Sequence, residues 1–195
     1  MTRRRLPLHA DDRGTTVLEF ALIAPVMLTM LLGFFELGHQ MYTTAILRGA
    51  VEAAGRSSSL ADGPLNSATI DAAVTNQVKS VANHARLSFD RRFYSDYTHV
   101  AKPERYTDAN NNGRWDSGEC LEDVNGNNSW DADPSRSGSG GAEDVIFYTV
   151  EVEYERLIPI GSLIGIGNDV TIKAGTLLKN QPFAEHQKPT VATCS

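Results

Sequence analysis

The feature that most constrains this chain is an uncharged apolar run near its N-terminus. No charged residue occurs between Phe20 and Phe35. With its flanking residues the run reaches the roughly 20 residues that a helix needs to span a bilayer. A secretory signal that is removed would have a shorter apolar core followed by a small-residue cleavage site, and the segment after Phe35 offers none. The sequence therefore favours a retained transmembrane helix over residues 15–37.

The charges around this run predict its orientation. Arg3, Arg4, Arg5 and Arg13 precede it, and positive residues are retained on the cytoplasmic side of a membrane helix. We therefore expect a single-pass protein of the inner (cytoplasmic) membrane, with its N-terminus inside and its C-terminal head in the periplasm or outside the cell. The net charge of −6 disfavours a nucleic-acid partner, because phosphate binding needs a basic face.

A carboxylate, Glu19, stands at the start of the apolar run. An acid in hydrocarbon costs several kcal/mol unless it lies near the interface or is paired. One interpretation places Glu19 among the lipid headgroups. In the other, the chain is cut after Gly14, Thr15 becomes the new N-terminus, and Glu19 is the fifth residue, near a free α-amine.

The segment Arg-Gly-Thr-Thr-Val-Leu-Glu-Phe-Ala-Leu-Ile-Ala-Pro of residues 13–25, with Phe-Phe-Glu-Leu-Gly at 34–38, resembles the TadE-like pseudopilins of the tight-adherence (Flp) pilus system. The Leu-Lys-Asn-Gln-Pro-Phe stretch of residues 178–183 resembles the tail of that family, with Gln181 replacing a Glu. The resemblance implies a basic leader, residues 1–14, removed by a prepilin peptidase at the cytoplasmic face. It also implies that other pseudopilins and the pilus secretion machinery are partners, and that Glu19 offsets the amine of a neighbouring subunit.

The remaining pattern predicts an α+β head on a long N-terminal helix. Apolar residues at helical spacing extend the first helix as a stalk to Arg56 and predict a second helix over 68–87. Strict alternation predicts strands over 146–154 and 170–176, and Phe93–Val100 suggests an edge strand. The apolar, Gly-rich segment 157–167 either covers the sheet or touches a membrane surface or a partner. We expect five parts along the chain. Residues 1–14 are a cytoplasmic leader, 15–37 the transmembrane helix, and 38–106 the helical stalk and the first part of the head. Residues 107–141 are a calcium-binding insert with its linker, and 142–195 are the β-rich C-terminal part of the head.

The segment 107–141 is an insert of different composition, and it contains a calcium-loop pattern. Residues 108–119 (loop 1) fit D-x-[DN]-x-[DN]-G-x5-E at every position. In this spacing, oxygens at alternate positions converge on one cation, Gly at the sixth allows a sharp turn, and the last Glu binds through both oxygens. The predicted ligands are Asp108, Asn110, Asn112, the carbonyl of Arg114, Asp116 and Glu119.

A second, degraded copy follows at residues 123–134 (loop 2), and the pair resembles dockerin-like calcium repeats. Asn128 replaces the Gly, which an Asn tolerates in the left-handed conformation. Pro134 stands where the bidentate Glu belongs, so the second site is either weaker or completed by Asp133. Its predicted ligands are Asp123, Asn125, Asn127 and Asp131. The alternative is a solvated acidic loop that binds no ion.

The two cysteines, Cys120 and Cys194, lack the spacing of a zinc or redox motif. If the head is exported, they are candidates for one disulfide that tethers the insert to the C-terminus.

Hydrolase, metalloprotease and phosphate-loop motifs are missing from the sequence, so we expect a protein that is not an enzyme. The leading hypothesis is a TadE-like pseudopilin or minor pilin with a calcium-stabilised exposed loop. The alternative is an uncleaved, membrane-anchored binding module whose calcium-dependent loop contacts a ligand or a surface.

Overall fold

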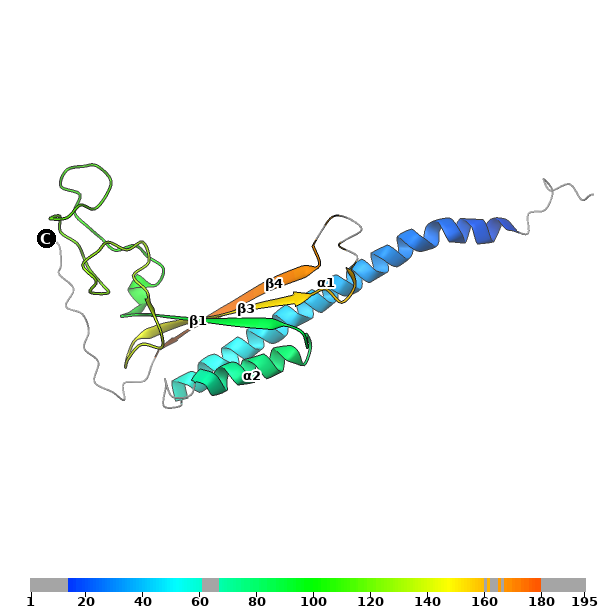
Figure 1. The fold of residues 1–195 in the computed structure, drawn as a ribbon, viewed down its shortest axis with the longest axis horizontal. Helices are drawn as coiled ribbons and strands as arrows, with labels where there is room; N and C mark the ends of the chain where they lie inside the picture. Colours follow the sequence, from blue (N-terminus) through cyan, green and yellow to red (C-terminus); the bar gives the residue numbers. More distant parts are fainter. Residues whose placement is uncertain (1–13, 61–66, 160, 162–164, 166, 180–195) are drawn as a thin grey trace, which may run out of the picture. The chain divides into compact units, whose positions relative to one another are not determined.

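The computed structural model of the chain describes residues 14–60, 67–159, 161, 165 and 167–179. The helices are α1 (Thr15–Leu60), α2 (Ser67–Lys79) and the short 3-10 helix η4 (Tyr97–His99). The strands are β1 (Arg86–Tyr94), β2 (Arg136–Ser137), β3 (Val145–Glu155) and β4 (Asp169–Lys179) (Figure 1). This is the α+β class that the sequence predicts. The expected leader and the family-like tail beyond Lys179 lie outside the described residues.

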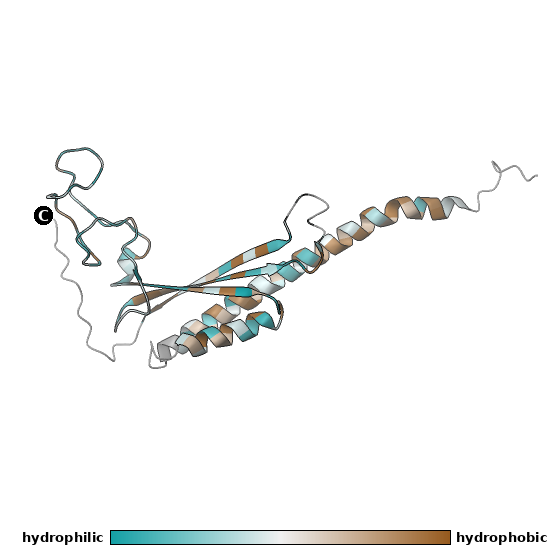
Figure 2. Cartoon of the chain, viewed as in Figure 1, coloured by the Kyte–Doolittle hydropathy of each residue, from teal (hydrophilic) through white to brown (hydrophobic). Residues whose placement is uncertain are grey.

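The chain divides into two compact units: Met1–Tyr42 with Glu155–Val170, and Thr43–Tyr154 with Thr171–Ser195. Helix α1 runs through both and is continuous across Pro25. In the first unit its apolar side chains are exposed, and Figure 2 shows hydrophobic colours along this part of the helix. One helix of the described residues, Thr15–Ser57, is long and apolar enough to cross a membrane.

In the second unit α1 has a buried face. Its members recur at intervals of three or four residues, which places them on one side of a helix. They are Thr43, Leu47, Ala50, Val51 and Ala54. A Cβ at Gly55 would lie 2.7 Å from Cδ2 of Leu178, so glycine permits the close approach of α1 and β4. The predicted stalk is therefore part of the core of the head.

The four strands form one sheet in the order β2-β1-β3-β4. Strands β1 and β3 are antiparallel, with Arg86 opposite Glu153 and Tyr94 opposite Val145. Alternate residues of β3 are buried, as the period of two in its sequence predicts. The strands predicted over 146–154 and 170–176 are thus confirmed as β3 and β4.

Two predicted elements have the wrong bounds. The second helix ends at Lys79 instead of residue 87. The bond from the N–H of Ser80 to the carbonyl of Asn76 still has helical spacing, whereas the bond from the N–H of Ala85 to the carbonyl of Ala82 closes a turn before β1. Beyond the turn β1 begins, earlier than the predicted edge strand. That strand does not continue to Val100, because the carboxylate of Asp96 caps η4 by accepting the N–H of Thr98 at 2.6 Å.

An ion pair joins α2 to the sheet. Arg91 lies on the inward face of β1, and its Nη1 donates to Oδ2 of Asp71 on α2 at 3.0 Å. The hydroxyl of Tyr148 on β3 donates to the same carboxylate at 2.8 Å, and the Arg91 guanidinium stacks 4.6 Å from the Tyr148 ring. Burial and the bond to Asp71 hold the pKa of the Tyr148 hydroxyl well above its usual value.

We predict that Asp71→Ala destabilises the head by about 2 kcal/mol, because it leaves the half-buried Arg91 without its carboxylate. The matched control is Asp90→Ala, which removes one of the two exposed partners of Arg92, leaves Asp133, and should cost less than about 0.5 kcal/mol. Thermal unfolding of the full chain in detergent, followed by the near-ultraviolet tyrosine signal, compares the two. Equal losses in both variants would show that Asp71 does not anchor α2.

Candidate functional site

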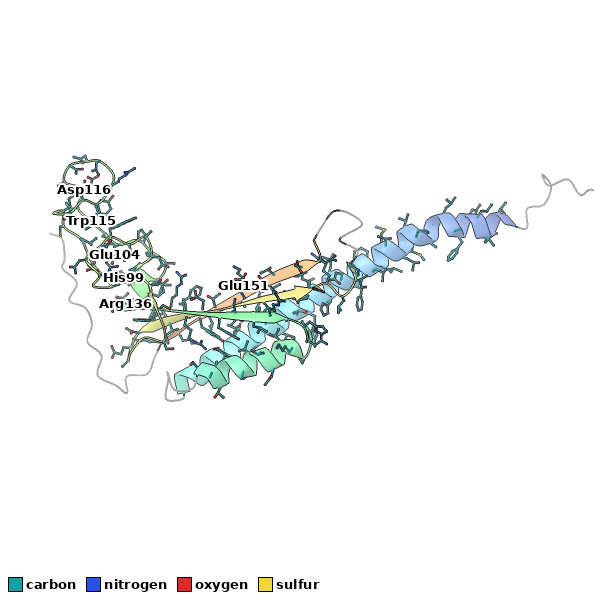
Figure 3. All side chains as sticks on the ribbon, viewed as in Figure 1. His99, Glu104, Trp115, Asp116, Arg136 and Glu151 are labelled. Carbon is teal, nitrogen blue, oxygen red and sulfur yellow. The ribbon has the colours of Figure 1, made fainter. Side chains whose placement is uncertain are left out.

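The insert follows β1 and η4 in the second unit, and a short antiparallel pairing closes its base. The N–H of Thr107 donates to the carbonyl of Cys120 at 3.0 Å, and the N–H of Glu122 donates to that of Arg105 at 2.8 Å. Both ends of loop 1 are therefore held together just before loop 2 begins. Figure 3 shows Glu104 at this base, with Trp115 and Asp116 farther out in the insert.

Loop 1 has the hydrogen-bond scaffold that its pattern predicts. Asp108 accepts the N–H groups of Asn112 and Gly113 at 3.1 and 2.8 Å, which folds the first half of the loop around one carboxylate. The amide nitrogens of Asn110 and Asn112 donate to Oδ2 of Asp116 at 2.8 and 2.6 Å. Their amide oxygens each accept one backbone N–H and keep a second lone pair for another partner.

Glu119 closes loop 1 with both carboxylate oxygens. Its Oε1 accepts the N–H of Ala109 and its Oε2 that of Asp116, each at 2.9 Å. The indole of Trp115 donates to the Glu119 carbonyl at 3.3 Å. Glu119, the predicted bidentate ligand at the twelfth position, therefore contacts the backbone of the second and ninth positions of its own loop.

Loop 2 repeats this scaffold. Asp123 accepts the N–H groups of Asn127 and Asn128 at 3.2 and 2.7 Å. The amide nitrogens of Asn125 and Asn127 donate to Oδ2 of Asp131 at 2.7 and 2.6 Å. The predicted ligands of the second copy are therefore brought together as in the first.

The turns of the two loops also agree. The fourth and sixth positions are left-handed in both: Asn111 and Gly113 have φ of 57° and 76°, and Gly126 and Asn128 have φ of 73° and 56°. Asparagine and glycine are the residues that adopt this conformation at least cost. Asn128 thus takes the place of the missing Gly, as predicted.

Of the two alternatives for loop 2, a weaker site or one completed by Asp133, the second finds no support in the geometry. Asp133 accepts the hydroxyl of Tyr94 at 2.9 Å and Nη1 of Arg92 at 3.3 Å, so its carboxylate is engaged with β1. The position of the bidentate Glu is occupied by Glu104 instead. Its Oε1 accepts the N–H of Val124 at 2.8 Å, and its Oε2 that of Asp131 at 3.0 Å.

Sequence reasoning missed Glu104 because the pattern was counted from the first Asp of each loop. Counted from the Glu, residues 104–118 and 119–133 form a tandem repeat of E-x3-D-x-N-x-N-[GN]-x-W-D. Both copies then contain a Glu, four residues before their Asp. The internal repeat was the signal that could have found it.

These loops offer oxygen donors of the kind that calcium prefers, from carboxylates, amides and backbone carbonyls. Throughout the described ranges, no three His, Cys, Asp or Glu side chains come together as a metal-binding cluster of their own. The carboxylates of each loop are instead held by backbone N–H groups, and the amides of two Asn residues stand between them.

Cys120 lies in the short backbone pairing between the two loops. Its expected partner, Cys194, lies outside the described residues, and their pairing stays a prediction.

The apolar helix is the second candidate site. Helix α1 begins at Thr15, directly after Gly14, and Glu19 lies exposed in its first turns. The helix exposes large apolar side chains around it, including Leu18, Phe20, Leu22, Ile23, Val26 and Phe34. A contiguous apolar surface of this kind marks contact with a membrane or with other protein.

Glu36 is the one charged residue of this part of α1 that is buried, with 4% of its surface exposed. Its Oε2 accepts the N–H of Ile158 at 3.4 Å, and Arg156 Nη1 lies 3.9 Å from its Oε1. The segment after β3 thus contacts α1 through this carboxylate, within the first unit. From the sequence alone, Glu36 was identified only as a residue at the outer end of the apolar run.

Residues 14–56 match the family model of the TadE-like proteins.

The matched range begins at Gly14 and ends in the buried face of α1, so the TadE-like similarity covers the helix with Glu19 and Glu36. It supports the resemblance that the sequence of this segment indicates, and it suggests a pilus-associated pseudopilin with a membrane helix. The insert and the sheet lie outside the match. Neither a curated protein nor a solved structure matches the chain.

We predict that Glu36→Ala frees the segment after β3 from α1. The amides of residues 156–158 should then exchange several-fold faster, because Ile158 loses its acceptor. Hydrogen exchange with mass spectrometry on the full chain in detergent measures this. Glu52→Ala, at an exposed position of the same helix, is the control and should leave those amides unchanged. Unchanged exchange in Glu36→Ala would mean that this carboxylate does not hold the segment.

Proposed function

We propose that this chain is a TadE-like pseudopilin or minor pilin, processed by a prepilin peptidase after Gly14, that acts in assembly of a tight-adherence (Flp) pilus. The observation that carries the proposal is the exposed apolar part of α1, residues 15–42, which lies within the family match. Its role is structural. The helix is held in the inner membrane with the head exported, and it packs laterally against helices of other pseudopilins.

Glu19 has a defined part in this proposal. Cleavage after Gly14 creates an α-amine at Thr15, and the Glu19 carboxylate of one subunit offsets that charge in its neighbour. Glu19 lies in the first turns of the apolar helix, and an acid in hydrocarbon costs several kcal/mol unless it is paired or reaches the interface. Lateral association thus relieves a cost that the isolated helix bears, which favours a specific stagger between subunits.

We predict that the mature protein begins at Thr15. The intact mass of the chain, purified from cells that contain the peptidase, should correspond to residues 15–195. In Gly14→Leu, or in cells without the peptidase, the mass should correspond to residues 1–195, because the enzyme requires the small residue before the cut. Thr16→Ala is the control and should be processed normally. A full-length mass from peptidase-containing cells would instead favour the membrane-anchored binding module.

The second part of the proposal is that calcium stiffens the exposed insert. Its support is loop 1, whose full pattern and hydrogen-bond scaffold bring two amides and three carboxylates to one loop. Without a cation these carboxylates repel one another. An exported head meets calcium at concentrations that suit a weak site.

We predict that calcium changes the fluorescence of Trp115, which contacts the closing residue of loop 1. In the full chain with Trp130→Phe, titration should give a saturable change. Asp108→Ala or Glu119→Ala should weaken it by about tenfold or more, because affinity follows the number of charged ligands. Ser117→Ala, in the same loop at a position that is not a predicted ligand, is the control. A response that survives both ligand substitutions would exclude this site.

A further inference from the structure

We propose that Glu104 is the bidentate ligand of a second calcium ion held by loop 2. The inference rests on calcium binding at the insert, which is part of the proposed function, and adds a ligand that lies outside the sequence of the loop it serves. Each ion would then be bound by one loop and closed by the Glu that heads one copy of the 15-residue repeat, Glu119 for loop 1 and Glu104 for loop 2.

Glu104 makes the same three contacts as Glu119, which in addition accepts the N–H of Asn110 at 3.4 Å. Both place Oε1 on the N–H of the second loop position and Oε2 on the N–H of the ninth. Both carbonyls accept the indole of the Trp at the eighth position, Trp115 at 3.3 Å and Trp130 at 2.8 Å. The same residue type thus meets the same three groups in each loop, although Glu104 comes from the opposite direction along the chain.

The burial of Glu104 is an independent indication of a cation. Only 3% of its surface is exposed, and the charges that face it are those of Asp123 and Asp131. In the described ranges it has no basic side chain as a partner, since its carboxylate contacts only two backbone N–H groups. A buried charge needs an opposite charge or a metal. A divalent ion between Glu104, Asp123 and Asp131 supplies it.

A hard divalent cation suits this donor set. Loop 2 offers the carboxylates of Asp123, Asp131 and Glu104 and the amide oxygens of Asn125 and Asn127, together with a backbone carbonyl at the seventh position. Calcium takes six to eight oxygen ligands in flexible geometry, whereas magnesium requires a tighter octahedron, so a loop of this length favours calcium. With Glu104 included, loop 2 has as many carboxylates as loop 1.

The position of Glu104 before loop 1 in the chain, although it closes loop 2, has a structural consequence. An ion in loop 2 joins residue 104 to residues 123–131, and all of loop 1 lies within the stretch of chain that is closed in this way. Loop 2 therefore stabilises the base from which loop 1 projects, and the two loops form one unit.

The two tryptophans of the chain allow each site to be observed alone, with Tb³⁺ as the luminescent probe for calcium. In the full chain with Trp115→Phe, excitation of Trp130 reports loop 2; with Trp130→Phe, Trp115 reports loop 1. We expect Glu104→Gln to weaken the loop 2 titration by about tenfold or more and to leave loop 1 titrating. The control is Asp133→Asn in the Trp115→Phe background, which should titrate like its parent within about twofold.

Glu104→Asp separates loss of the ligand from loss of the fold. It keeps the charge but shortens the reach by one methylene, so it should also weaken loop 2 while the loop 1 signal persists. Retention of the loop 2 titration by both Glu104 variants, or its loss in Asp133→Asn alone, overturns the inference and leaves calcium binding at loop 1 standing. If neither the Trp115→Phe nor the Trp130→Phe chain, each with its calcium ligands intact, gives a Tb³⁺ signal, calcium binding at the insert is overturned as a whole.

Discussion

Helix α1 is continuous, but its two parts need different surroundings. The arrangement of the rest of the chain depends on this constraint. From Thr15 to Tyr42 the large apolar side chains of α1 are exposed, whereas from Thr43 onward one face is buried in the head. Transfer of apolar area out of water contributes about 25 cal/mol per Å², so contact with lipid or with other helices would stabilise the exposed part. Glu36 lies close to the change, where a carboxylate can still be paired by polar groups of the same unit.

In the head, too, a charged side chain on an inward face is paired by specific polar partners. Arg91 faces inward on β1 and would be costly there alone, but the carboxylate of Asp71 and the ring of Tyr148 both receive it. An ion pair of this kind selects one arrangement of α2 on the sheet, because no shifted register would match all three groups. The insert, which has little apolar core, relies on polar contacts almost throughout, and this makes it sensitive to whatever neutralises its carboxylates.

Local periodicity predicted the elements whose pattern continues without interruption, namely α1, β3 and β4. It failed where a pattern changes within a few residues. Val74, Val78, Val81 and Ala85 keep a helical spacing through the turn that ends α2, so the sequence alone extended the helix too far. The pairing of Arg91 with Asp71 and of Glu36 with Arg156 depends on tertiary contacts between distant residues, for which periodicity has no signal.

Glu104 illustrates a different limit, which concerns register within a repeat. A motif counted from its first Asp assigns the closing Glu to the end of the same loop, and Pro134 then makes loop 2 look degraded. Counted from the Glu, both copies are complete, and the short pairing of residues 105–107 with 120–122 determines which Glu meets which loop. This pairing brings Glu104 beside Val124. As a result, the Glu of each copy contacts the loop of the other copy. In the proposed calcium site, loop 2 takes its closing ligand from the preceding copy, so calcium affinity would depend on both copies together.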